Sequence, residues 1–292
     1  MTIRHFLRFA ITAVLLLSGC SPQRPKPTLI VYHAAVFEPV VRDLYPSAAR
    51  ELSLTIRAET GSSGHLIRRH VELGRRCDLL LSADPSFFRS LGQGRFPWYL
   101  VWLADEMVLA VGVRAPHPDW AERDWVAALR APGIRLGRAD EKISPAGQYT
   151  LRIWERMERR GYPGLSAELR QKTSLVADDI GTLAARLKTG DLDYAFLFRS
   201  AAYMHEIRFI ALDPDINFSK ESSDGAPSIR LAASIPTDAA QPQAAEALLR
   251  WLIRPERQEW NDRGFRSLPP LFFGSRADYA RFADMAEYGG EP

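Results

Sequence analysis

The sequence is poor in cysteine, in clustered metal ligands and in excess charge of one sign. It has only two cysteines, Cys20 and Cys77, so the mature chain can form no internal disulfide if Cys20 is acylated. Cys77 begins an apolar run, and we expect it to be buried rather than reactive. The six histidines are scattered without zinc-ligand spacing, so we expect no side-chain metal site and no cofactor. A net charge of only +3 argues against a nucleic-acid partner.

The chain also lacks an apolar run long enough to cross a membrane. Two arginines precede an uncharged stretch at residues 9–17, which is typical of a secretory signal and too short for a bilayer span. The stretch ends in Leu17-Ser18-Gly19-Cys20, which resembles the bacterial lipobox, where the cysteine becomes the lipid-modified first residue. We therefore predict a signal peptide over residues 1–19 and a lipidated cysteine with an extended tether over residues 20–27. The alternative is a signal peptide with an incidental cysteine.

Short strand-like runs alternate with longer amphipathic segments through the remaining chain. This alternation predicts βαβ units on a mostly parallel sheet, and so an α/β fold. Residues 217–228 are expected to form a surface loop, and the tail from Gly264, with Pro269-Pro270, to wrap on the surface of the first domain. The predicted strands are residues 28–32, 54–59, 77–82, 106–113, 133–137, 193–198 and 229–235, and the predicted helices are residues 37–51, 64–74, 145–160, 178–190, 199–206 and 239–253.

The segment from Thr60 to Asp84 is the most informative, because a loop rich in small hydroxyl residues opens a helix and a buried strand follows. The amides of a first helical turn have no intrahelical partner, and the helix dipole places partial positive charge there. Ser62 and Ser63 add hydroxyl donors without steric bulk. This pattern indicates a site for a small oxyanion, and the alternative is an ordinary helix cap that binds nothing.

Five motifs occur in a familiar order and spacing along nearly all of the mature chain. They are Val31-Tyr32-His33-Ala34-Ala35, Gly61-Ser62-Ser63, Ser82-Ala83-Asp84, Ser144-Pro145-Ala146-Gly147-Gln148-Tyr149 and Gly190-Asp191-Leu192-Asp193-Tyr194. Together with the signal and lipobox, they resemble the periplasmic molybdate/tungstate-binding proteins of ABC importers.

The resemblance implies a type II periplasmic-binding-protein fold, with two α/β lobes joined by two crossing strands and a ligand cleft between them. On that template, lobe 1 comprises residues 28–107 plus 234–292, and lobe 2 comprises residues 108–233. The crossing strands fall at residues 106–113 and 229–235.

The resemblance also implies a set of ligand-binding positions. Ser62 and Ser63 match the serine loop of the bacterial molybdate binders, Ala146 matches a backbone amide donor, and Ile180 stands where the family has a valine that donates its amide. Two positions depart from the pattern: Val36 replaces a serine and offers only its amide, and Phe198 replaces a tyrosine and has no hydroxyl. The carboxylates of the archaeal tungstate binders correspond here to Ser144 and Leu197.

Other side chains near these positions are candidates to replace what is lost. Ser144 has a hydroxyl, and Arg199, His33 and His65 have side chains that carry or can carry positive charge. Each also has a purely structural interpretation, as a solvated residue at a helix start or a strand end. Loss of two hydrogen bonds to a charged ligand, at about 1.5–3 kcal/mol each, would weaken binding by two or more orders of magnitude.

The leading hypothesis is a monomeric, lipid-anchored solute-binding protein on the extracytoplasmic side of the membrane, which carries a small oxyanion such as molybdate or tungstate to an ABC permease. The alternative is a sensor or envelope-complex partner that keeps the fold with an altered or lost site. Catalysis is not expected, because no nucleophile motif accompanies the carboxylate pairs. Those pairs are Asp178 with Asp179, Glu155 with Glu158, and Asp191 with Asp193. We interpret Asp178 and Asp179 as helix caps and the two glutamates as part of a solvated helix face.

Overall fold

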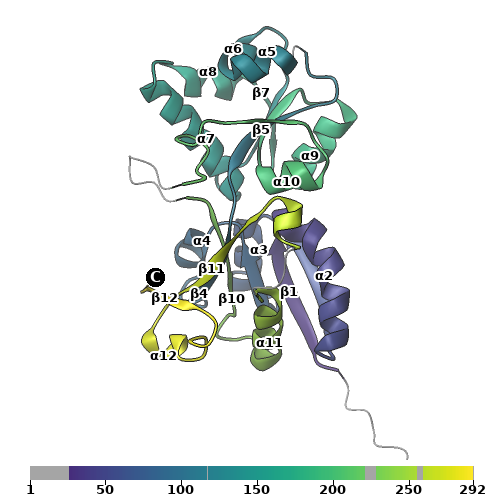
Figure 1. Ribbon diagram of the computed structural model, residues 1–292, viewed down its shortest axis with the longest axis vertical. Helices are drawn as coiled ribbons and strands as arrows, with labels where there is room; N and C mark the ends of the chain where they lie inside the picture. Colours follow the sequence, from purple (N-terminus) through teal and green to yellow (C-terminus); the bar gives the residue numbers. More distant parts are fainter. Residues whose placement is uncertain (1–25, 117, 221–227, 255–258, 292) are drawn as a thin grey trace, which may run out of the picture.

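The computed structural model describes residues 26–116, 118–220, 228–254 and 259–291. The predicted signal peptide and Cys20 lie outside these ranges. Two bodies are stacked along the long axis, each built on one sheet (Figure 1). No helix in the described ranges is long and apolar enough to cross a membrane.

The first body is built on a seven-stranded sheet with the order β12-β11-β4-β10-β3-β1-β2. Its strands are β1 (Thr28–Ala34), β2 (Thr55–Gly61), β3 (Leu79–Ser82), β4 (Tyr99–Ala104), β10 (Arg230–Ser234), β11 (Arg266–Phe273) and β12 (Glu287–Gly290). Its helices are η1 (Ala35–Phe37), α2 (Glu38–Glu51), α3 (Ser63–Val71), α4 (Ser86–Leu91), α11 (Pro242–Leu252), η2 (Asn261–Arg263) and α12 (Arg276–Tyr279).

The second body is built on a five-stranded sheet with the order β7-β6-β8-β5-β9. Its strands are β5 (Met107–Val111), β6 (Leu136–Ala139), β7 (Thr173–Ala177), β8 (Tyr194–Phe198) and β9 (Phe209–Ala211). Its helices are α5 (Pro118–Arg123), α6 (Trp125–Arg130), α7 (Pro145–Arg159), α8 (Leu165–Lys172), α9 (Ile180–Thr189) and α10 (Arg199–Met204).

Five strands of the first sheet share one topology with the five strands of the second. In the first, β1 pairs in parallel with β2 and β3, and β10 runs antiparallel between β3 and β4. In the second, β6 pairs in parallel with β7 and β8, and β5 runs antiparallel between β8 and β9. In each sheet the parallel strands therefore end at one edge, and helices begin just beyond those strand ends.

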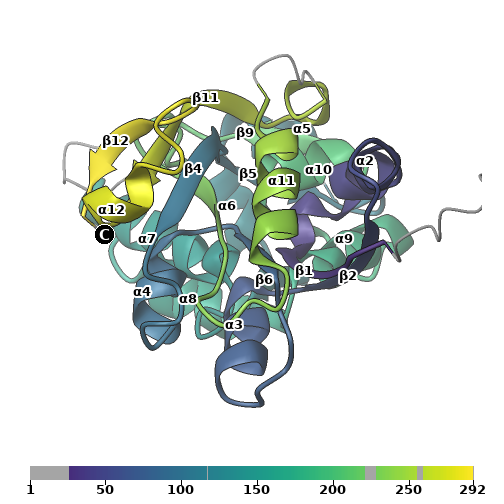
Figure 2. The same ribbon diagram turned by 90° about the horizontal axis from the view of Figure 1, so that it is seen from below.

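Strand periodicity explains how the seven-stranded sheet is covered on both faces. Alternate residues such as Val31 and Leu79 pack in a core with α2 and α11, whereas Tyr32 and Leu80 pack in a second core with α3 and α4. Figure 2 shows these two helix pairs on opposite faces of the sheet. Cys77 is buried in the second core, as predicted, and burial raises the pKa of its thiol.

The chain passes between the sheets at Asp105 and Glu106, between β4 and β5, and it returns after β9 to reach β10. The two strands predicted to cross each lie within a single sheet, β5 in the five-stranded one and β10 in the seven-stranded one. The prediction of a surface loop from Asn217 was wrong at its start. Asn217 and Phe218 are buried, and the Asn217 carbonyl accepts from the Met107 amide at 2.8 Å. Residues 221–227 of the predicted loop lie outside the described ranges.

The C-terminal tail lies against the first body, as predicted. The prediction did not include its strands: β11 and β12 extend one edge of the seven-stranded sheet, and their residues are mostly exposed or half-buried. Pro269 and Pro270 are compatible with a strand here because the pairing with β4 is interrupted between Ser267 and Leu271, where the register shifts.

Candidate functional site

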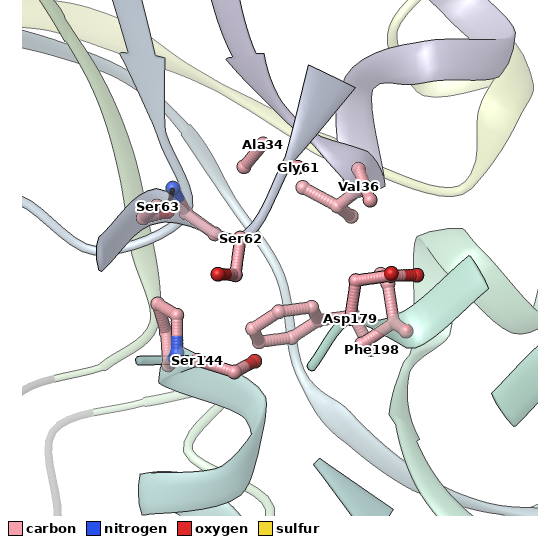
Figure 3. A pocket seen from close by; sticks show the side chains of 12 residues that line it. Ala34, Val36, Gly61, Ser62, Ser63, Ser144, Asp179 and Phe198 are labelled. Atoms are coloured by element: carbon pink, nitrogen blue, oxygen red, sulfur yellow. Dashed lines mark hydrogen bonds between the residues drawn. The ribbon is translucent and has the colours of Figure 1, made fainter. Parts of the chain in front are cut away.

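A small pocket lies where both sheets present strand ends and helix starts (Figure 3). It holds about 240 Å³, counting the part open to solvent. Within it, the centre of a water-sized sphere can move through only about 10 Å³, so the pocket has no room for a large organic ligand. The lining residues are Ala34, Ala35, Val36, Gly61, Ser62, Ser63, Ala83, Ser144, Pro145, Asp179, Ile180 and Phe198.

Five of the lining residues are helix N-caps, each of a different helix. Ala34 precedes η1, Ser62 precedes α3, Ser144 precedes α7, Asp179 precedes α9 and Phe198 precedes α10. The longest three, α3, α7 and α9, have 9, 15 and 10 residues and so carry developed dipoles. Their positive ends meet at one space, which favours negative charge there without any cationic side chain.

The Ser62 hydroxyl is the most informative group in the pocket. Ser62 is 6% exposed, and its Oγ is buried without a hydrogen-bond partner among the described residues. It occupies the N-cap position of α3, yet its side chain makes no capping bond. Leaving a buried hydroxyl unpaired costs about 1–3 kcal/mol, so an ordinary cap does not account for it.

The neighbouring Ser63 has a different role. Its Oγ accepts a hydrogen bond from the Ala83 amide at 3.1 Å, and the side chain is fully buried. This bond ties the start of α3 to the loop after β3. Ser63 therefore holds two walls of the pocket together and keeps its own O–H free to donate.

Asp179 is the single ionisable residue among the twelve described residues that line the pocket, and Lys, Arg and His are missing from that set. Its Oδ1 accepts from the Thr182 amide at 2.9 Å, which confirms the predicted cap of α9 at this position. Sequence reasoning treated Asp179 only as a cap and missed that it lines the pocket. The sequence signal that could have shown this is its position directly before Ile180, which was already a candidate site residue.

Two hydrogen bonds cross from one body to the other beside the pocket. The Gly64 amide donates to the Ile143 carbonyl at 3.1 Å. The Tyr149 hydroxyl donates to Asp84 Oδ2 at 2.9 Å, with both side chains buried. Burial, followed by the nearby Asp84 charge, raises the pKa of Tyr149, so the phenol keeps the proton it donates.

Six of the nine sequence-predicted residues line this one pocket, and three do not. The six are Val36, Ser62, Ser63, Ser144, Ile180 and Phe198. Ala146 follows the lining residue Pro145 and is fully buried, but it is not itself part of the lining.

Arg199 lies on the far side of Phe198, at the passage between the sheets. Its Nε is 3.5 Å from Glu106 Oε1, and its amide donates to the Glu106 carbonyl at 2.8 Å. The guanidinium is therefore paired near the passage and not directed into the pocket.

His33 is buried behind the first loop, outside the pocket. Its Nε2 is 3.2 Å from Glu38 Oε2, and its ring meets Tyr45 edge-on at 6.0 Å. Burial lowers the pKa of His33, opposed by the Glu38 charge. His65, the other histidine considered, is exposed on α3.

The described part of the chain holds no metal cluster, and ion pairs engage both members of one predicted carboxylate pair. No three His, Cys, Asp or Glu side chains in these ranges are grouped to hold a metal ion. Of the carboxylate pairs, Asp193 is 2.5 Å from Arg135, and Asp191 is 2.9 Å from Arg186. These ion pairs account for both aspartates structurally.

Comparison with known proteins identifies the architecture. The family model described as bacterial extracellular solute-binding protein matches residues 29–266. An uncharacterised solute-binding protein of Petrotoga mobilis is 25% identical over 279 residues, which cover 83% of this chain and 84% of the relative. The molybdate/tungstate-binding protein WtpA of Thermococcus kodakarensis is 23% identical over 279 residues, which cover 80% of this chain and 79% of that protein.

Among solved structures, the Azotobacter vinelandii periplasmic molybdate-binding protein superposes with a TM-score of 0.66 at 18% identity. The match covers 82% of this chain and 99% of that one. At this identity the likeness shows the fold, and it confirms the predicted type II periplasmic-binding-protein fold. The topology that the two sheets share agrees with this fold.

Proposed function

This chain belongs to the bacterial extracellular solute-binding protein family, and we propose that it captures a small tetrahedral oxyanion for an ABC importer. Molybdate and tungstate are the first ligands to test, since the relative from Thermococcus kodakarensis is named for them. The observation that carries the proposal is the buried Ser62 hydroxyl, which has no partner within the described ranges and lies where helix N-termini converge.

The donors in this pocket are neutral, and they suit an anion of modest size. Ser62 and Ser144 present hydroxyls, and the starts of α3 and α9 present backbone amides. Val36 and Phe198 replace hydroxyl donors of the molybdate binders with apolar surface. We expect weaker binding than in a complete molybdate site, or selection of a different tetrahedral oxyanion.

The same proposal covers the setting of the site. We propose that Cys20 is lipidated and that residues 20–27 tether a monomer to the extracytoplasmic face of the membrane. Lobe 1 is then the body on the seven-stranded sheet, lobe 2 is the body on the five-stranded sheet, and the ligand is held between them. The boundaries expected after residues 107 and 233 shift by a few residues, because Met107 begins β5 and residues 230–233 belong to β10. The role of the protein in this proposal is to bind the ligand and deliver it to a permease, rather than to catalyse a reaction. A sensor with a lost site is less favoured, because the unpaired Ser62 hydroxyl suits a site that still takes a ligand.

Isothermal titration calorimetry and thermal shift on residues 21–292 test the proposal. The panel is molybdate, tungstate, sulfate, thiosulfate, phosphate and chromate, each as the sodium salt at constant ionic strength. We expect submicromolar binding of at least one anion, with a rise in melting temperature that grows with its concentration. If no member of the panel binds, the proposed function is wrong.

A further inference from the structure

Asp84 and Tyr149 join the two bodies next to the pocket. Asp84 lies just after β3 of the seven-stranded sheet, and Tyr149 lies on α7, which packs on the five-stranded sheet. The phenol oxygen is 2.9 Å from Asp84 Oδ2, and the residues are 2% and 7% exposed. A bond to a carboxylate that is shielded from water is stronger than one between neutral groups at the surface.

Each partner is held firmly within its own body. Asp84 Oδ1 accepts from the Ser86 amide at 2.7 Å, and the Asp84 carbonyl accepts from the Ser82 hydroxyl at 2.7 Å. The Tyr149 ring packs against Phe218 at 4.9 Å between centroids. Neither side chain is therefore free to follow the other, and separation of the two bodies breaks the bond.

The bond is also coupled to the pocket from both sides. Asp84 directly follows Ala83, a lining residue whose amide donates to Ser63. The ring of Tyr149 meets the ring of Phe198, another lining residue, edge-on at 6.3 Å. A ligand that contacts Ala83, Ser63 or Phe198 is therefore linked, through residues in direct contact, to Asp84 or to Tyr149.

We propose that the Tyr149–Asp84 hydrogen bond is a latch that holds the two lobes closed over the ligand and so sets its rate of release. The part of this inference that concerns the ligand rests on the proposed function. Tyr149 and Asp84 act as positioning residues, because their bond favours the arrangement in which the helix starts meet. Delivery of the ligand then requires that this bond be broken.

Tyr149→Phe tests the latch, because it deletes the hydroxyl and keeps the ring that contacts Phe198 and Phe218. The matched control is Tyr194→Phe, since the Tyr194 hydroxyl donates to the Pro116 carbonyl at 2.8 Å within one body. With molybdate, or the anion of the panel that binds best, we expect Tyr149→Phe to raise Kd about 10- to 100-fold, mainly through faster dissociation. Tyr194→Phe should leave Kd and the dissociation rate within about twofold of wild type.

A second measurement does not depend on any ligand. Small-angle scattering of ligand-free protein should give a larger radius of gyration for Tyr149→Phe than for wild type and Tyr194→Phe. Asp84→Asn keeps an acceptor oxygen, so its effect should be smaller than that of Asp84→Ala. The Tyr149→Phe/Asp84→Asn pair should show a coupling in Kd that a purely structural role would not give.

The outcomes separate the two proposals. If wild type binds none of the anions, the proposed function fails while scattering still decides the latch. If Tyr149→Phe matches wild type in radius of gyration, with and without anion, and in dissociation rate, the latch is wrong. A Tyr149→Phe variant that is less stable but unchanged in both readouts equally overturns it.

Discussion

The backbone amide of Gly64 donates to the carbonyl oxygen of Ile143 at 3.1 Å, so the second residue of α3 touches the loop that leads into α7. A β carbon at Gly64 would lie 2.8 Å from that oxygen and 3.0 Å from the Ile143 Cα. Both obstacles are backbone atoms, which cannot rotate aside. The contact between the start of α3 and the loop before α7 thus depends on a residue without a side chain.

Gly64→Ala should therefore weaken anion binding without unfolding either body. Overpacking costs about 1–3 kcal/mol, which corresponds to roughly 10- to 100-fold in Kd if it is relieved by separation of the two bodies. Gly181→Ala is the control, because Gly181 is the second residue of α9 and its added β carbon would meet only Asp179 Oδ1, at 3.1 Å. Calorimetry on both variants decides, and equal Kd values for them would contradict the prediction.

Ser62→Ala and Ser63→Ala should separate binding from stability. The Ser62 hydroxyl has no hydrogen-bond partner among the described residues, so its removal should leave the free energy of unfolding unchanged or higher and raise Kd about 10- to 100-fold. Removing the Ser63 hydroxyl strands the Ala83 amide and should lower the free energy of unfolding by about 1–3 kcal/mol. Urea unfolding and calorimetry measure the two effects. A Ser62→Ala variant with wild-type affinity would remove the main support for the site.

Much of the pocket could be predicted from the sequence because its residues sit at local landmarks. A hydroxyl residue at a helix start is visible in the chain, and Ser62 and Ser63 were found in this way. Val36, Ser144, Ile180 and Phe198 were predicted from the family resemblance, and they also line the pocket.

Contacts between distant elements could not be predicted in the same way. Tyr149 and Asp84 are 65 residues apart, and nothing local shows that the phenol reaches that carboxylate. The direction of Arg199 depends on Glu106, to which it is paired after β8 and β5 have come together. The strand β11 was missed because two prolines usually exclude a strand, and only a register shift accommodates them.

Asp179→Asn should strengthen the binding of a doubly charged anion. Asparagine caps helices as well as aspartate does, so the bond to the Thr182 amide is kept while the one negative charge of the lining is removed. Relief of at least about 1 kcal/mol of repulsion corresponds to roughly a fivefold lower Kd. Asp178→Asn is the control, because Asp178 is exposed and does not line the pocket. The gain should shrink in 1 M salt, and equal gains in both variants would point to net charge instead.

Asp105 places a buried carboxylate at the passage between the two sheets. Its Oδ1 accepts from the Glu106 amide at 2.8 Å and from the Ser200 amide at 3.3 Å, and its Oδ2 accepts from the Ser200 hydroxyl. Burial raises the pKa of Asp105 from 3.8 to about 7, and the hydrogen bonds from Ser200 and Glu106 only partly offset this effect.

The free energy of unfolding should therefore fall as the pH rises from about 4 to about 7, because of Asp105. The unfolded chain releases this proton near 3.8 and the folded chain near 7, so in that window the folded state binds more protons and its free energy of unfolding falls as pH rises. The full effect is on the order of 4 kcal/mol at about 1.4 kcal/mol per pKa unit. Asp105→Asn stays neutral and can donate to Ser200, so urea unfolding at pH 5 and pH 8 should show its advantage over wild type growing with pH. The exposed Asp124→Asn should show no such growth, and a constant difference for Asp105→Asn would rule the effect out.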